Sequence, residues 1–158
     1  MNPYLHYVSE YDRLMKEGRL LPLGGFTPDE QPAVSETASK ALLFSPHPDD
    51  ECIVGGLALR LLREEKYQVL NVAVTQGSRK ERQAARWTEL EKACGYLGFG
   101  LLQIGDHGLE GVHLKTREQH AREWMGAVET IAGIIRDQAP KVVFMPHAED
   151  WNSTHIGV

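Results

Sequence analysis

The stretch ALLFSPHPDDECIVGGLAL, residues 41–59, decides the fold of this chain. It opens with an apolar run without alternation, which is typical of a strand buried on both faces of a parallel sheet. It closes with small and apolar residues that suit a helix, and His47, Asp49, Asp50 and Glu51 lie between the two. The stretch therefore predicts a strand-to-helix junction that carries an imidazole and three carboxyl groups, at the edge where parallel α/β folds place their chemistry.

The rest of the chain repeats this alternation of strands and helices. Apolar runs predict strands at 41–45, 68–74, 100–104 and 141–145, and helical spacing predicts helices at 51–65, 79–97 and 116–138. The pattern predicts an α/β fold, a Rossmann-like parallel sheet with helices on both faces, in a single domain over residues 41–158. Residues 1–40 are expected to form a helix at 4–18 followed by a connector rich in Pro, Gly and Ser.

Two of the predicted helices carry further expectations. In the helix at 51–65, apolar residues at helical spacing are expected to face the core: Ile53, Leu57, Leu61 and Leu62. In the helix at 79–97, Arg86 and Glu89 lie one turn apart. They are expected to form an ordinary surface ion pair, which contributes little to stability.

The composition argues against several classes of partner. The chain has 17 Lys and Arg against 22 Asp and Glu, a formal charge of −5 and no long basic run, so nucleic acid is not expected to bind. The two cysteines, Cys52 and Cys94, favour a reducing cytoplasm over a disulfide framework. No apolar stretch approaches the ~18 residues of a membrane helix. We therefore expect a cytoplasmic protein that binds a small molecule, and the sequence leaves a homo-oligomer open.

The expected strand order is 3-2-1-4, which would make the loops after the first and fourth strands neighbours. These loops hold His47–Glu51 and His147–His155. A catalytic zinc site needs three imidazole, carboxylate or thiolate ligands and one open position. His47 and Asp50 are expected to supply two ligands. The second loop offers four candidates for the third: His147, Glu149, Asp150 and His155. His155 is preferred because residues 152–155 resemble a helix start that turns a histidine inward.

Other polar and aromatic residues near these loops are candidates for roles in the site. Asp49, beside ligand Asp50, is the natural general base for a metal-bound water. The acidic run is equally typical of a helix N-terminus with no function, but the preceding histidine favours the metal site. Trp151 is expected either to stack on a sugar ring or to anchor its loop. Residues 75–79, which end in Arg79, are expected to line a substrate pocket.

These residues together resemble the LmbE-like (PIG-L) family of zinc-dependent N-acetylglucosaminyl deacetylases. The resemblance covers about residues 40–158 and rests on four motifs: Pro46–Glu51, Thr75–Gly77, Arg86–Glu89 with Ala93 and Leu97–Gly98, and Thr154–His155. It implies a Rossmann-like fold and the hydrolysis of an acetamide on an amino sugar. It also implies Zn²⁺ bound by His47, Asp50 and His155, with Asp49 as the general base.

The chain departs from the family pattern at the last motif. Where better-known members have the first histidine of His-Pro-Asp-His, this sequence has Asn152. The oxyanion donor is therefore expected to be Asn152 or His147. Family members usually continue well past the third ligand, so the domain is expected to be incomplete. Two alternatives remain: a zinc amidase acting on a non-sugar or thiol-conjugate acyl amine, and a non-catalytic module that binds metal or sugar. A divalent ion other than zinc also suits the ligands.

Overall fold

A four-stranded parallel sheet forms the centre of the computed structural model, which describes residues 2–22, 24–27 and 30–158. The strands are β1 (Lys40–Ser45), β2 (Gln68–Ala73), β3 (Gly100–Gln103) and β4 (Val142–Phe144). Their order in the sheet is β3-β2-β1-β4. The predicted α/β fold and the predicted strand order are therefore confirmed, and β1 and β4 lie side by side.

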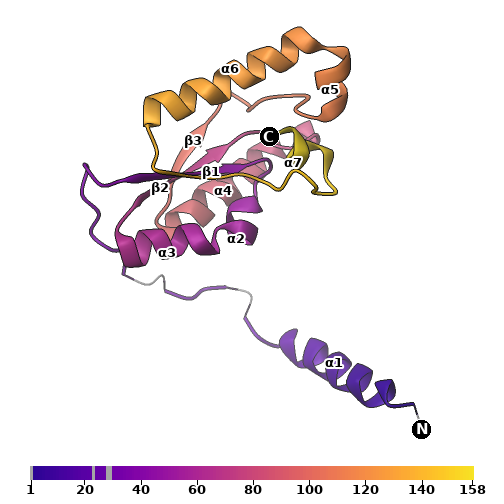
Figure 1. The fold of residues 1–158 in the computed structure, drawn as a ribbon. Coiled ribbons are helices and arrows are strands. Elements are labelled where there is room, and N and C mark those ends of the chain that lie inside the picture. The colour runs from indigo at the N-terminus through magenta and orange to yellow at the C-terminus, as the bar shows by residue number, and fades with distance from the viewer. Residues whose placement is uncertain (1, 23, 28–29) are drawn as a thin grey trace.

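Helices cover both faces of the sheet (Figure 1). One layer holds α2 (Asp50–Val54), α3 (Gly56–Glu65) and α4 (Gln83–Leu97), with the short η1 (Lys80–Arg82) before α4, and α6 (Ala121–Gln138) lies across the opposite face. Two short helices, α5 (Leu114–Gln119) and α7 (Ser153–Gly157), lie near the carboxyl ends of the strands. The result is the three-layer arrangement that strand–helix alternation predicts.

Strand β1 is buried on both faces, which explains its unbroken apolar run. Ala41 and Leu43 are inaccessible to solvent and pack in the core cluster that includes residues of α3 and α4. Leu42 and Phe44 point the other way, into a cluster against which residues of α6 pack. Successive side chains of a strand point to opposite faces of the sheet, and each face of β1 is covered by a core cluster. Both sets of side chains must therefore be apolar, so the sequence of β1 does not alternate between apolar and polar residues.

The predicted helix at 51–65 is two helices with a break at Gly55. A Cβ atom at Gly55 would lie only 2.0 Å from the Glu51 carbonyl oxygen, so this position needs a glycine. The break changes which side of the second helix faces the core: Ala58 is buried, whereas Leu57 is 56% exposed. Ile53 is 73% exposed. The prediction that Ile53 and Leu57 face the core was therefore wrong, because it assumed one continuous helix.

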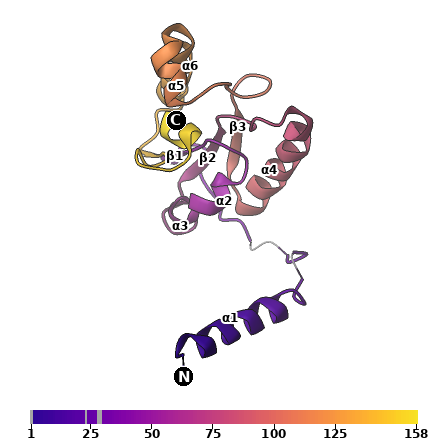
Figure 2. The same cartoon turned by 90° about the vertical axis from the view of Figure 1, so that its right-hand side faces the viewer.

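The N-terminal helix α1 (Tyr4–Gly18) forms at the predicted residues. It lies away from the sheet and its helices in both views (Figures 1 and 2), and none of its residues is buried. Its ion pairs join residues of the same helix, as between Arg13 and Glu17 at 2.9 Å. The sheet domain is therefore packed without help from α1. Among the described residues, no helix combines the length and the apolar character needed to cross a membrane.

Candidate metal centre

The turn between β1 and α2 is held in place by the chain that follows β2. Backbone pairing continues past both strands, since Val74 N–H donates to the Ser45 carbonyl (3.0 Å) and Thr75 N–H to the Pro46 carbonyl (3.1 Å). The buried Thr75 hydroxyl also donates to the Pro46 carbonyl, at 2.7 Å. These bonds fix the main chain directly before His47 and so set the direction in which the turn leaves the sheet.

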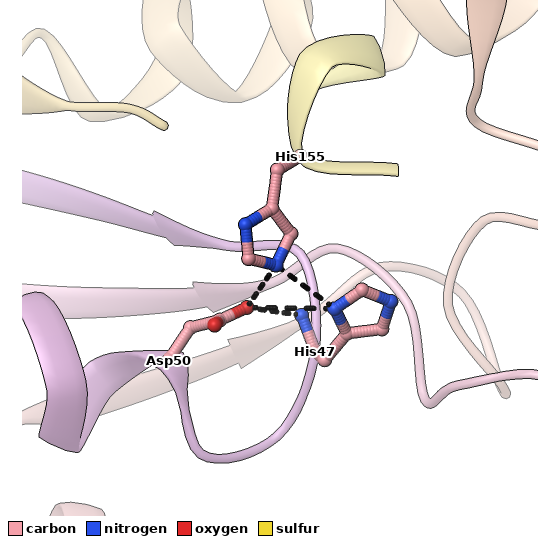
Figure 3. Close-up of side chains that lie close together, drawn as sticks. All are labelled: His47, Asp50 and His155. Atoms are coloured by element: carbon pink, nitrogen blue, oxygen red, sulfur yellow. Dashed lines mark hydrogen bonds and ion pairs between the residues drawn. The ribbon is translucent and has the colours of Figure 1, made fainter. Parts of the chain in front are cut away.

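Three side chains converge beyond the end of β1 (Figure 3). His47 and Asp50 come from the turn and the start of α2, and His155 comes from α7. His47 Nδ1 lies 3.2 Å from His155 Nε2 and 3.7 Å from Asp50 Oδ2. His155 Nε2 lies 3.5 Å from Asp50 Oδ2. The three atoms form one group that could hold a metal ion.

The spacing of these donor atoms suits a small divalent ion. Ligand atoms 3.2–3.7 Å apart, placed at the corners of a tetrahedron, lie about 2.1 Å from its centre, which matches the bonds of zinc to nitrogen and oxygen. Two imidazoles and one carboxylate also leave a fourth position for water or substrate. The donor set therefore fits an open, catalytic type of metal site, and it also accepts other first-row divalent ions.

Neighbouring groups hold the donor atoms in orientation. Asp150 Oδ2 lies 3.1 Å from His155 Nδ1, so that Nδ1–H donates to the carboxylate and Nε2 keeps its lone pair for the cluster. The His47 backbone N–H donates to Asp50 Oδ2 at 2.7 Å. Burial raises the pKa of Asp50, but the hydrogen bonds from His47 and the charge of His155 outweigh it, so the pKa lies below its ordinary value. Asp50 is thereby kept ionised, as a ligand must be.

Asp49 differs from its neighbour Asp50 in conformation and in surroundings. Its φ angle is 115°, in the left-handed region that non-glycine residues rarely adopt. Its carboxylate Oδ2 lies 3.3 Å from Arg86 Nη2, and the same guanidinium donates to the Pro48 carbonyl. Asp49 lines one hollow of about 330 Å³ together with the three clustered side chains. The Asp49 carboxylate therefore lies beside the cluster of His47, Asp50 and His155 without being part of it.

A larger cavity of about 500 Å³ opens next to this hollow. It is lined by the loop after β2, by the loop between β3 and α5, and by the start of α7, and His47 and Asn152 line both spaces. Asn152 is the N-cap of α7, where its Oδ1 accepts the Thr154 N–H at 2.9 Å. The cap occupies the amide oxygen, so the NH₂ group is the part of this side chain available as a donor.

Three residues that the sequence associated with the site lie elsewhere. His147 is exposed, its Nδ1 accepts the Glu149 N–H at 3.1 Å, and it lines neither space. Trp151 is 92% exposed on the loop before α7. Arg79 lines a separate hollow with Arg82 and Arg86. The structure does not bring the three into contact with the cluster, and their predicted roles rest on the sequence alone.

Sequence reasoning missed two residues that contact Asp49. Arg86 was expected to pair with Glu89 on the surface, but its guanidinium points to Asp49 and Pro48 instead. Glu51 belongs to the acidic run expected at a helix start, and its carboxylate does accept the N–H of the α2 N-cap, Asp49, at 2.9 Å, but it is 2% exposed instead of solvated. Helical spacing alone could not reveal either contact, because both depend on how the turn folds against α4.

The chain belongs to the PIG-L family, whose sequence profile, described as GlcNAc-PI de-N-acetylase, matches residues 42–158. This confirms the resemblance seen in the motifs. The matched segment begins within β1 and includes all three clustered side chains, whereas α1 lies outside it. A comparison with curated proteins gives no match.

Solved structures with a similar fold carry different activities. One is the N,N'-diacetylchitobiose deacetylase of Pyrococcus horikoshii, with 21% identity and a TM-score of 0.51, covering 96% of this chain and 54% of that one. A deacetylase of teicoplanin biosynthesis has 18% identity and a TM-score of 0.58 (75% and 59% covered). The 4-carboxy-2-hydroxymuconate hydratase GalB of Pseudomonas putida KT2440 has 22% identity and a TM-score of 0.53 (74% and 51% covered). The chain thus spans between about half and three fifths of the length of these proteins.

Proposed function

We propose that this chain is a metal-dependent hydrolase that removes an N-acetyl group from an amino-sugar-type substrate. The observation that carries the proposal is the group of His47, Asp50 and His155 with the carboxylate of Asp49 lining the same hollow. The family profile supports it, since its description is that of a de-N-acetylase. The adjoining cavity of about 500 Å³, with polar residues along its walls, is large enough for a sugar-sized ligand.

The proposed roles follow from the position of each group. A zinc ion held by the three donors would act as a Lewis acid toward water and toward the acyl oxygen of the substrate. Asp49 would take the proton from the attacking water and return it to the amide nitrogen as the C–N bond breaks. The products are acetate and a free amine. Arg86 would keep the Asp49 carboxylate next to the cluster, since Arg86 Nη2 lies 3.3 Å from Asp49 Oδ2.

Charge that develops on the acyl oxygen needs a hydrogen-bond donor. Asn152 is the better placed of the two predicted candidates, because it lines the hollow that holds the cluster and its NH₂ group is not used by the cap. His147 lines neither space and would have to move to reach a substrate. We therefore assign Asn152 as the oxyanion donor in this proposal.

The fold alone does not select this reaction, since one structural neighbour is a hydratase. The alternatives are an amidase for a non-sugar or thiol-conjugate acyl amine and a module that binds metal or sugar without catalysis. Release of a free amine separates hydrolysis from binding. Comparison of an N-acetylated sugar with an N-acylated thiol conjugate separates the two classes of hydrolase substrate.

The decisive experiment compares wild type, Asp49→Asn and His47→Ala for bound zinc and for amine release from N-acetylglucosamine and its oligomers. We expect wild type to bind one zinc and hydrolyse the sugar. Asp49→Asn should keep the zinc and lose about 10²–10⁴-fold in rate, because general base catalysis contributes that much. His47→Ala should lose the metal. Full activity in Asp49→Asn would remove the assigned base, and a wild type that binds zinc but releases no amine would favour the binding module.

A further inference from the structure

Glu51 is a buried carboxyl group that bonds the backbone N–H of Asp49, the N-cap of α2, and its burial is more than such a cap requires. It is 2% exposed, and its two oxygens accept hydrogen bonds from neutral donors: the Asp49 N–H at 2.9 Å and the Cys52 thiol at 3.2 Å. Acidic residues in the first turn of a helix are normally solvated, where they gain from the helix dipole at little cost. Burying a carboxyl group costs free energy that an apolar side chain of the same size would avoid.

The main chain that Glu51 holds is in a costly conformation. Asp49 has φ 115° and ψ −24°, a left-handed conformation that is strained for a non-glycine residue. Such strain persists only where surrounding groups over-determine the conformation. Glu51 supplies one constraint, on the N–H of Asp49, and Arg86 supplies two, on the Pro48 carbonyl and the Asp49 carboxylate.

We propose that Glu51 is a positioning residue that holds the Asp49 main chain in its strained conformation and so keeps the Asp49 carboxylate beside the metal-binding cluster. This inference rests on the proposed function, in which Asp49 is the general base. Without the bond from Glu51, the Asp49 N–H would lose its acceptor, and the turn would be left with the Arg86 contacts and the backbone bonds that the Asp49 carbonyl accepts from the start of α2. A displacement of about 1 Å at a reacting group can cost about 10²-fold in rate.

The test compares three substitutions in the full chain. Glu51→Leu removes the acceptor and keeps an apolar side chain of similar size, whereas Glu51→Gln keeps one carbonyl oxygen for the Asp49 N–H. Cys52→Ala removes the other partner of Glu51 and is the matched control. Each variant is measured for zinc content, for kcat and KM on the acetylated sugar, and for hydrogen exchange at the Asp49 amide. Glu51→Met, which is flexible and fills a similar volume, replaces Glu51→Leu if that variant does not fold.

We expect Glu51→Leu to keep one zinc, to lose about 10²-fold in kcat with KM within about 2-fold, and to exchange its Asp49 amide faster. Glu51→Gln should recover most of kcat and of the amide protection, and Cys52→Ala should resemble wild type. If Glu51 had only a structural role, Glu51→Leu would lower the thermal midpoint of unfolding but would not lower kcat while leaving KM nearly unchanged. Unchanged kcat or unchanged Asp49 exchange in Glu51→Leu would overturn the proposal.

The amide measurement separates this inference from the proposed function. If wild type hydrolyses no acetylated substrate, the proposed function fails, and exchange at Asp49 still decides whether Glu51 holds the main chain. Faster exchange in Glu51→Leu supports the positioning role in that case as well, and unchanged exchange overturns it.

Discussion

Asp150 orients the imidazole ring of His155. Its Oδ2 lies 3.1 Å from His155 Nδ1, while its Oδ1 accepts the Asn152 N–H at 2.8 Å. One carboxylate therefore fixes the tautomer of a ligand and the turn that leads into α7. The sequence placed Asp150 among four candidates for the third ligand, and in the structure its carboxylate contacts His155 and lies outside the group of three that could hold a metal ion.

This arrangement predicts the effect of Asp150→Asn on metal binding. The substitution keeps an oxygen for the Asn152 N–H but replaces the carboxylate that polarises His155, so zinc affinity should fall about 10–100-fold while the fold is retained. Competition with a chromophoric chelator measures the affinity. The control is Glu149→Gln, which removes a neighbouring exposed carboxylate. Equal affinity in wild type and Asp150→Asn would show that Asp150 does not support the ligand.

At the scale of elements, the loop between β2 and α4 lies against the side chain of Arg86, which contacts Asp49. Gly77 lies in this loop with φ +81°, and a Cβ atom there would lie 2.8 Å from Arg86 Nη1. The loop is tied back by the Gly77 N–H, which donates to the Thr75 hydroxyl at 3.1 Å. Gly77 therefore has two separate reasons to be glycine: its backbone conformation and the close approach of the Arg86 side chain.

Gly77→Ala should separate these two effects when it is compared with Gly105→Ala. Gly105 also has a positive φ, +57°, but a Cβ atom there would meet nothing within 4 Å. Both variants should lose about 1 kcal/mol of stability from backbone strain. Only Gly77→Ala should also lower kcat, by about 10-fold or more, because it displaces the guanidinium that holds Asp49. Denaturant titration and amine release measure the two quantities. A similar kcat in both variants would mean that Arg86 does not position Asp49.

At the scale of the whole molecule, the sheet was predictable from sequence and much of the site was not. The apolar run at 41–44 and the alternation of strands and helices predicted the parallel sheet, and the expected strand order, which the structure has, predicted that the loops of His47 and His155 meet. The orientation of Arg86 depends on the exact path of the turn and of α4 against each other. The burial of Glu51 and its bond to the Asp49 N–H depend on the conformation of the turn before α2. Neither is a property of local periodicity, so neither could be read from one sequence.

The core beneath the site has a titratable group of its own, Cys94. It is 2% exposed, it belongs to the cluster formed with α3 and β1, and burial raises the pKa of its thiol to about 12, with the charge of Glu51 adding to the shift. The unfolded thiol has an ordinary pKa near 9. Between the two values the unfolded state releases a proton that the folded state keeps, so the folded state loses stability as the pH rises above about 9.

Comparison with Cys94→Ala isolates this contribution from those of lysines and tyrosines. Between pH 9 and pH 10 the free energy of unfolding should fall by about 1 kcal/mol more in wild type than in the variant. Below pH 8 the two should differ by a constant amount, which reflects the small cavity left by the sulfur and the lost hydrogen bond from Asn71. Urea titrations at pH 7, 8, 9 and 10 measure both proteins. If the free energies of unfolding of the two proteins changed in parallel from pH 7 to pH 10, the Cys94 thiol would ionise as easily in the folded core as in the unfolded chain.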